Sequence, residues 1–457
     1  MKHTAKLTAC LLTMALTACS AAPQDVPASQ TTAKPPAAAA PQDVPASQTT
    51  AEPPAAAAQA ILSPVYTTWG ASVGKECVYS AMNIDDAGQY YATSIDFATG
   101  EQRILCTKSG CTHSDENCPA YMTSIQDGCV PVSALLPTDD RLYWIVDGRH
   151  NGSDGAYVDV SNADGSDRRR VAEGDTLPDL TDVYVWYTDG TGLYGIVRSY
   201  GEICGLHIDE SGVVSFFDHD IPDGEDYFAV GCWQDKIVLQ HSGGYVQQPL
   251  NPAGDAATDE ELRAWLAADE QAQNEQTKNL CLLDTAGNLT VTDMSWTGAD
   301  GNVQLVNNGA AYVLNESGQV TKLDLSAGTA ATRRLDLQGT LQYSIAGTAT
   351  FDGWIPVTVR NDSEGVLNPE TGAYTPLPTT WLKDQAVERS PFVVAASDTM
   401  LLVQYGEVYY TANGIGPDGI PYSSTTCRGE YGIIPVTDYL AGSQDWVQVT
   451  LQGRDLV

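Results

Sequence analysis

The chain has few basic residues and no long apolar segment. Lys and Arg number 23 against 58 Asp and Glu, so the formal net charge is −35. This negative charge argues against a nucleic-acid-binding protein, because an acidic protein surface repels phosphate backbones. It also argues against peripheral binding to anionic lipid. The longest apolar run, from Leu7 to Ala18, is shorter than the about 20 residues that a membrane-spanning helix needs.

Histidine is also scarce, and two familiar catalytic motifs are missing. The six histidines are scattered, and the sequence contains neither an H-E-x-x-H zinc motif nor a phosphate-binding P-loop. These absences favour a protein that is not an enzyme. They leave one catalytic class open, because the paired carboxylates of a glycoside hydrolase have no sequence signature among 58 acidic residues.

The N-terminus has the layout of a secretory signal. Lys2 and Lys6 precede the apolar run, which ends at Leu16-Thr17-Ala18-Cys19. This ending resembles a bacterial lipobox, in which Cys19 receives a diacylglyceryl thioether and becomes the new N-terminus. We expect residues 1–18 to be a lipoprotein signal peptide. Cys19 would then anchor the chain in the cell membrane, facing the extracellular side, or the periplasm in a Gram-negative cell. Cleavage by ordinary signal peptidase is the alternative.

Residues 19–60 have a low-complexity composition. Residues 23–40 recur as residues 41–58 with a single change, from Lys34 to Glu52. Because the repeats contain no aromatic residue and few bulky apolar ones, burial cannot offset the entropy of ordering them. Their prolines favour extended polyproline II over helix. We predict a disordered tether that separates residues 61–457 from the membrane.

Residues 61–457 have the pattern of an all-β domain. Short apolar runs, such as 142–146 and 310–314, alternate with turns that begin at Asp or Asn and end at Gly. The turn glycines recur about every 40–50 residues apart from one longer gap, at Gly165, Gly212, Gly287, Gly328 and Gly372. This interval suits four-stranded blades, so we predict a β-propeller of seven blades, with six or eight as alternatives. A pair of β-sandwiches is the competing fold.

The longer gap contains a helix signal. Thr258 and Glu261 fit a capping box, and Leu262, Trp265 and Leu266 follow at helical spacing. We predict a helix near 257–277, inserted in a blade, which would either cover a partner site or pack on the rim. We also expect the ring to close by pairing of residues 61–68 with residues 446–451 in the last blade.

Cysteine is concentrated in one segment. Cys106, Cys111, His113 and Cys118 lie close together, and Cys129 follows. Export favours disulfides among these cysteines. Three thiolates and an imidazole at short spacing are alternatively suited to Zn²⁺, and buried reduced thiols are a third interpretation. Of the 11 cysteines, Cys10 lies in the signal and Cys19 accepts lipid, so an odd number remains. At least one thiol therefore lies outside any intramolecular disulfide.

A second, weaker candidate metal site is acidic. Asp218, Asp220, Asp223 and Asp226 cluster in one short segment, and grouped carboxylates can bind Ca²⁺. Their spacing does not match an EF-hand loop. A solvated turn between blades is the alternative interpretation.

The lipobox, the Asp-Gly turns and the cysteine segment together resemble uncharacterised lipoproteins of anaerobic gut Firmicutes, whose propeller domains are of the TolB or DUF5050 type. The resemblance includes a C-x₄-C-x-H-x₄-C-P stretch, matched here by Cys106, Cys111, His113, Cys118 and Pro119. It implies a fold and a surface location, and no activity.

We expect a monomeric cell-surface lipoprotein whose propeller is a non-catalytic binding or scaffold module for a glycan, a peptide or an envelope protein. The alternative is an extracellular carbohydrate-active hydrolase with a carboxylate pair in the propeller funnel. We expect no nucleic-acid partner and make no firm prediction of a cofactor, with Zn²⁺ and Ca²⁺ as the candidate ions.

Overall fold

The computed structural model describes residues between Ile61 and Leu451. Its gaps are 66–70, 84–88, 114–116, 125–133, 147–155, 175–176, 178–179, 181–182, 200, 246–257, 338, 344–349, 360–363, 378–379, 383–386, 390 and 416–420. The expected signal peptide, tether and lipidation site at Cys19 lie outside the described residues, as does Cys129. None of the described helices is both long and apolar enough to cross a membrane.

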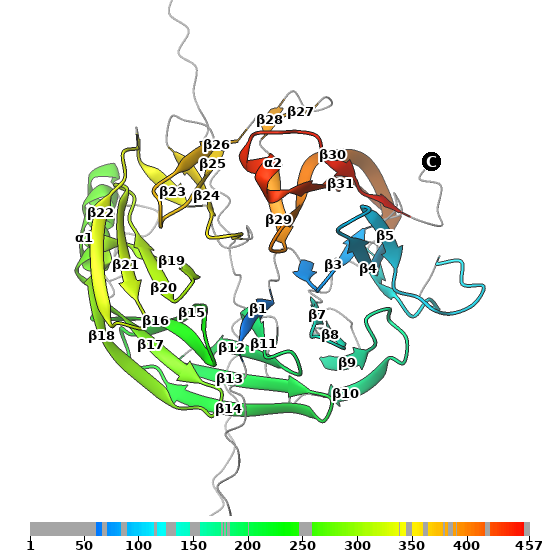
Figure 1. The fold of residues 1–457 in the computed structure, drawn as a ribbon, viewed down its shortest axis with the longest axis horizontal. Helices are drawn as coiled ribbons and strands as arrows, with labels where there is room; N and C mark the ends of the chain where they lie inside the picture. The colour runs from blue at the N-terminus through cyan, green and yellow to red at the C-terminus, as the bar shows by residue number, and fades with distance from the viewer. Residues whose placement is uncertain are drawn as a thin grey trace, which may run out of the picture. The chain divides into compact units, whose positions relative to one another are not determined.

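Seven sheets, antiparallel apart from one C-terminal strand, radiate from a central axis as the blades of a β-propeller (Figure 1). The structure thus confirms the predicted all-β fold and its seven blades. Blade 1 contains β2 (Ala71–Val73), β3 (Cys77–Asn83), β4 (Gln89–Asp96), β5 (Glu101–Ile104) and β6 (Tyr121–Ser124). Blade 2 contains β7 (Ala134–Pro137), β8 (Leu142–Val146), β9 (Tyr157–Ser161) and β10 (Arg169–Glu173). Blade 3 contains β11 (Val183–Thr188), β12 (Leu193–Ser199), β13 (Glu202–Asp209) and β14 (Gly212–Asp220).

The remaining blades follow in chain order. Blade 4 contains β15 (Asp226–Trp233), β16 (Lys236–Gly243), β17 (Thr277–Asp284) and β18 (Leu289–Thr297). Blade 5 contains β19 (Asn302–Asn307), β20 (Ala310–Leu314), β21 (Gln319–Asp324) and β22 (Thr329–Arg334). Blade 6 contains β23 (Leu341–Tyr343), β24 (Ile355–Val359), β25 (Glu364–Leu367) and β26 (Tyr374–Pro376). Blade 7 contains β29 (Phe392–Ala396), β30 (Met400–Ile415), β31 (Pro421–Pro435) and β32 (Val447–Gln448), and the hairpin of β27 (Thr380–Leu382) and β28 (Val387–Arg389) precedes it.

Position within a blade decides the composition of a strand. Every residue of β8 and β20, the second strands of blades 2 and 5, is buried. Adjacent blades cover both faces of such a strand, so it reads as a continuous apolar run. The outermost strand β22, with the sequence TAATRR, is exposed along its whole length. This gradient explains why the sequence shows short apolar runs rather than strict alternation.

The predicted turns owe their shape to Asp or Asn at the start and Gly at the end. Asp96 Oδ1 accepts hydrogen bonds from the backbone N–H of Ala98 at 2.9 Å and of Thr99 at 2.8 Å, and Gly100 has φ of 71°. The Thr99 hydroxyl donates to the same carboxylate, and these bonds hold the pKa of Asp96 below its usual value. The side chain thus replaces part of the ladder where the chain reverses.

The predicted inserted helix is α1 (Asp259–Glu275), which lies between β16 and β17. Thr258 caps it, because its hydroxyl accepts from the Glu261 N–H at 3.3 Å while Glu261 accepts from the Thr258 N–H at 2.8 Å. None of its residues is buried, and it contacts the 3₁₀ turn η4 (Gly298–Asp300). The second helix of the described chain is the short α2 (Val436–Leu440) in blade 7.

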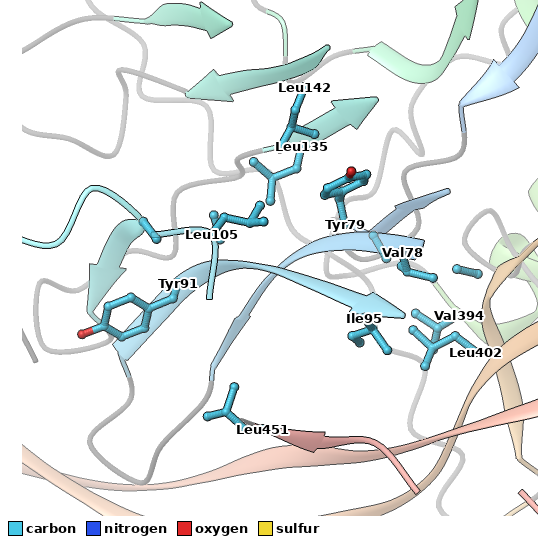
Figure 2. Close-up of a cluster of buried hydrophobic side chains, with 14 of the residues drawn as sticks. Val78, Tyr79, Tyr91, Ile95, Leu105, Leu135, Leu142, Val394, Leu402 and Leu451 are labelled. Atoms are coloured by element: carbon cyan, nitrogen blue, oxygen red, sulfur yellow. The ribbon is translucent and has the colours of Figure 1, made fainter. Parts of the chain in front are cut away.

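The prediction that residues 61–68 pair with residues 446–451 to close the ring is wrong. The N-terminal strand β1 (Ser63–Val65) pairs with the inner strand β11 of blade 3, and the C-terminal strand β33 (Thr450–Leu451) pairs in parallel with β5 of blade 1. Val65 and Leu451 are both buried, in different hydrophobic clusters. Figure 2 shows Leu451 in the cluster that also contains Ile95 and Leu105. Each terminal strand therefore joins the blade where its apolar side chain is covered, rather than pairing with the other.

Candidate metal centre

The outer strand of blade 1 is broken where the cysteine segment is inserted. β4 pairs with β5 along one half, through Thr93 to Ile95, and with β6 along the other half, through Gln89 to Tyr91. The segment from Leu105 to Ala120 connects these two short strands. It brings Cys106, next to the end of β5, back toward Cys118, just before β6. Strands β5 and β6, which pair with the two halves of β4, thus hold the two ends of the cysteine segment close together.

The four predicted ligand residues converge. Single ligand atoms of Cys106, Cys111, His113 and Cys118 all lie within 4.8 Å of one another. His113 Nδ1 is 3.3 Å from Cys118 Sγ. Zn–S bonds of about 2.3 Å and Zn–N bonds of about 2.0 Å in a tetrahedron separate such atoms by about 3.5–3.8 Å. The donor set and its spacing therefore fit a four-coordinate metal ion.

The local backbone is arranged for this convergence. Gly110 has φ of 71° and His113 has φ of 49°, so two left-handed residues turn the chain sharply around Cys111. The His113 backbone N–H hydrogen-bonds to the Cys111 thiol and is the main cause of that thiol's lowered pKa. Burial raises the pKa of Cys118 to about 12. A bound cation would be needed to hold the buried Cys118 as a thiolate near neutral pH.

A residue of blade 2, Arg168, holds the end of the cysteine segment next to Cys118 in place. The Arg168 guanidinium donates to the Pro119 carbonyl at 2.8 Å, stacks on the Trp144 ring at 3.9 Å and pairs with Asp159 at 2.8 Å. Blade 2 therefore supports the segment of blade 1 that carries Cys118. The sequence contains no signal for this contact, because Arg168 lies far from the cysteines along the chain and belongs to an unremarkable basic run.

None of the cysteines whose side chains the structure describes forms a disulfide, and these are Cys77, Cys106, Cys111, Cys118, Cys204, Cys232 and Cys281. The interpretation of the segment as a disulfide staple is therefore wrong for Cys106, Cys111 and Cys118. Their sulfurs instead lie in a set with an imidazole, which is the arrangement that binds a metal. All four positions are filled by protein side chains, and such closed sites are typically structural rather than catalytic.

The acidic segment behaves differently from the cysteine segment. Asp226 pairs with Arg198, whose Nη2 lies 2.8 Å from Asp226 Oδ2, and Asp218 accepts a hydrogen bond from Ser215. Among the described residues, the groups that converge tightly enough to hold a metal ion do not include Asp218, Asp220, Asp223 or Asp226. Calcium at this segment stays a prediction.

The described inner strands of the propeller contain almost no carboxylate side chains. Across the described inner strands β1, β2, β7, β11, β15, β19, β23 and β29, the one carboxylate is Asp226, which is paired with Arg198. β1 lies beside β11 near the centre of the ring (Figure 1). It is held there by the Leu62 N–H, which donates to the Gln234 carbonyl at 2.7 Å, and by the Cys232 thiol, which donates to the Leu62 carbonyl. The described inner strands thus lack the carboxylate pair of a glycoside hydrolase.

One serine matches the letters of a nucleophile motif without its structure. Gly70-Ala71-Ser72-Val73-Gly74 reads as G-x-S-x-G. A nucleophile elbow requires a sharp turn between a strand and a helix that exposes the serine. Ser72 instead lies within strand β2, is fully buried and donates its hydroxyl to the Leu135 carbonyl. Its environment is that of a structural serine.

No protein-family model matches the chain, and no curated protein matches it. Solved structures with a similar fold do exist. BamB from Moraxella catarrhalis is 11% identical with a TM-score of 0.33, covering 81% of this chain and 99% of that one. The WD40 beta propeller domain of Doa1 is 9% identical with a TM-score of 0.32, covering 75% and 94%. An oligogalacturonate lyase in complex with manganese is 11% identical with a TM-score of 0.35, covering 58% and 71%. Because these TM-scores are low, the assignment of this chain as a seven-bladed propeller depends on its own strand pairing.

Proposed function

We propose that the chain is a lipid-anchored surface protein whose propeller, clamped by a structural Zn²⁺, is a non-catalytic binding or scaffold module. The observation that carries the non-catalytic part is the composition of the inner strands. The carboxylate that they contain in the described chain, Asp226, is already neutralised by Arg198. A propeller hydrolase would need two carboxylates about 5–10 Å apart and free to act on substrate.

The surface location is supported by the lipobox-like ending at Cys19 and by the proline-rich tether that follows it. Growth with an alkyne fatty acid, followed by click labelling, tests this part. We expect Cys19→Ser to abolish the label and to release the protein from the membrane fraction. Cys10→Ser is the matched control, because Cys10 also follows Leu-Thr-Ala but lies inside the apolar run. Equal labelling of the wild type and Cys19→Ser would contradict the anchor.

The structural Zn²⁺ is supported by the convergence of Cys106, Cys111, His113 and Cys118. Elemental analysis of the purified full chain should give about one zinc per chain, and Cys111→Ser should lower this stoichiometry. Cys204→Ser is the control, because Cys204 is a free thiol on β13 outside the set. A metal-free protein whose mass rises on reduction would show instead that the thiols oxidise to disulfides.

The binding role is tested against the hydrolase alternative in one assay. The full chain is incubated with neutral and acidic polysaccharides, and both retention on the polymer and release of reducing ends are measured. We expect retention of the chain, or of an envelope protein with it, without new reducing ends. Release of reducing ends that is absent from a heat-inactivated sample would establish an enzyme.

A further inference from the structure

A polar cavity lies where blades 5 and 6 meet. Its volume is about 210 Å³, and it is bordered by the turn between β19 and β20, by Asp352 and Gly353 just before β24, and by the turn between β25 and β26. The polar side chains of its wall are Asn307, Asn308, Tyr312, Lys322, Asp352, Asn368, Glu370 and Thr371. A second cavity of about 180 Å³ adjoins it and shares Lys322 and Glu370. The two form one cleft along the boundary between the blades.

One part of the cleft wall is held rigidly. Glu370 accepts a hydrogen bond from the Tyr312 hydroxyl at 2.7 Å and pairs with Lys322 at 2.8 Å. Tyr312 is buried and belongs to the core between the two blades. The ion pair neutralises the lysine within the wall, and the other positive charge at the cleft, Arg333 beside the second cavity, donates to the Pro369 carbonyl. The arrangement fixes three polar groups at the point where the two cavities join.

The other part of the wall has polar groups that the protein does not use. Gly353 has φ of 77°, and a Cβ at that position would lie 2.8 Å from Asn307 Nδ2 and 3.6 Å from Asn368 Nδ2. The absent side chain leaves both carboxamide donors beside the same space. Within the described part of the chain, the side chains of Asn307 and Asp352 have no hydrogen-bond partner. Donors and an acceptor thus border the cavity without protein partners.

These groups select a class of ligand. Carboxamides both donate and accept, a carboxylate accepts, and a ligand with many hydroxyls satisfies both kinds of group. Phosphorylated or acidic ligands would meet Asp352, Glu370 and a chain of net charge −35. The cavity is smaller than the about 300 Å³ at which pockets for drug-sized ligands begin, so it suits one small ring. The adjoining cavity has room for a neighbouring unit.

We propose that the cleft between blades 5 and 6 binds a neutral saccharide, with one sugar ring hydrogen-bonded by Asn307, Asn368 and Asp352. This inference depends on the proposed binding role and names its ligand and its place. The Lys322–Glu370 pair stands between that ring and the second cavity, where Thr332 and Arg333 border the position of the next unit.

Isothermal titration of the full chain with maltose, cellobiose, lactose and mannobiose tests the proposal, with the chain in a zwitterionic detergent that carries no sugar. At least one of these disaccharides should bind. Asn307→Ala and Asp352→Asn should each weaken the binding about tenfold, the usual effect of losing one or two hydrogen bonds. Asparagine tolerates the left-handed backbone of residue 352, where φ is 44°, so the second variant keeps the turn. Asp293→Asn, an exposed carboxylate on β18, is the control and should bind like the wild type.

The outcomes separate the site from the function. Binding that is unchanged in both Asn307→Ala and Asp352→Asn would place the saccharide elsewhere and overturn this site, while the proposed binding role would stand. Binding of glucuronic acid or of a peptide in preference to every neutral disaccharide would overturn the ligand class. No binding by any disaccharide would overturn the inference, whereas the anchor and zinc tests would still decide the rest of the proposed function.

Discussion

At the scale of single residues, Lys278 is a buried positive charge that has no carboxylate partner among the described residues. It is 6% exposed, and its ammonium donates to the Gly301 carbonyl at 3.2 Å and to Asn302 Oδ1 at 2.6 Å. Both acceptors have a second donor: Trp296 Nε1 reaches the carbonyl, and Gln240 Nε2 reaches Asn302. The lysine can therefore be removed without leaving either acceptor unpaired.

Lys278→Met should raise the free energy of unfolding by about 1 kcal/mol near pH 7, because it removes the cost of burying a charge. Burial lowers the pKa of Lys278 below 10.5, so the unfolded chain binds more protons between the folded pKa and 10.5. Wild-type stability therefore rises with pH in that window, and the advantage of the variant should disappear toward pH 10.5. Chemical denaturation at several pH values measures both effects, and a gap that widens with pH would contradict the explanation.

At the scale of elements, the C-terminal strand β33 closes blade 1 with only a short length of chain. Leu451 packs in the cluster with Tyr91, Ile95 and Leu105 (Figure 2). Leu451→Ala should lower the free energy of unfolding by about 2 kcal/mol or more, because a buried leucine is truncated. The matched control Val447→Ala, at a residue that is 50% exposed in β32, should cost about 0.5 kcal/mol or less. Equal losses in the two variants would show that the packing of β33 does not stabilise blade 1.

The cysteine segment connects to the same strand. Cys106 follows β5, which is the strand that β33 pairs with, and Cys118 shares the hydrophobic cluster of Leu451. Removal of the proposed Zn²⁺ with a chelator should therefore increase hydrogen exchange in both β5 and β33, before it affects blade 4 on another part of the ring. Cys204→Ser with chelator should behave like the wild type with chelator. Uniform exchange throughout the propeller would contradict this local coupling.

The helix α1 offers the opposite case, an element outside the hydrophobic core. It has a complete capping box and no buried residue. Thr258→Ala should destabilise the helix by about 1 kcal/mol, because the N-cap hydrogen bond is lost. Hydrogen exchange of residues 262–275 should increase, while the melting temperature of the propeller should stay unchanged. A fall in melting temperature would mean that α1 stabilises blade 4.

At the scale of the whole molecule, sequence reasoning succeeded where the signal was local. The turn from Asp96 to Gly100 and the capping box at Thr258 each depend on neighbouring residues, and both have the predicted form. The prediction of how the ring closes was wrong. The pairing of β1 with β11 depends on which sheet edge, far away in the sequence, can bury Val65. The spacing of Cys106, Cys111 and Cys118 fits both disulfides and a metal site. The sequence cannot decide between these two interpretations, because the way in which β5 and β6 bring the cysteines together is visible only in the structure. The cleft at Asn307 and Asp352 has no sequence signature, because its residues come from separate strands and turns of two blades.

The net charge of −35 is a property of the whole chain, and it should make stability depend on salt. Lys and Arg are too few to pair with most carboxylates, so the folded chain concentrates repulsion that the unfolded chain spreads out. Raising NaCl from 0.01 M to 1 M shortens the Debye length from about 30 Å to about 3 Å, which screens this repulsion. It also weakens exposed pairs such as Arg103–Glu101, which contribute little. Repulsion should prevail, so the melting temperature should rise by at least about 2 °C across this range. A fall would show that ion pairs such as Arg168–Asp159 outweigh the net charge, and sucrose at matched osmolarity controls for exclusion of solute from the surface.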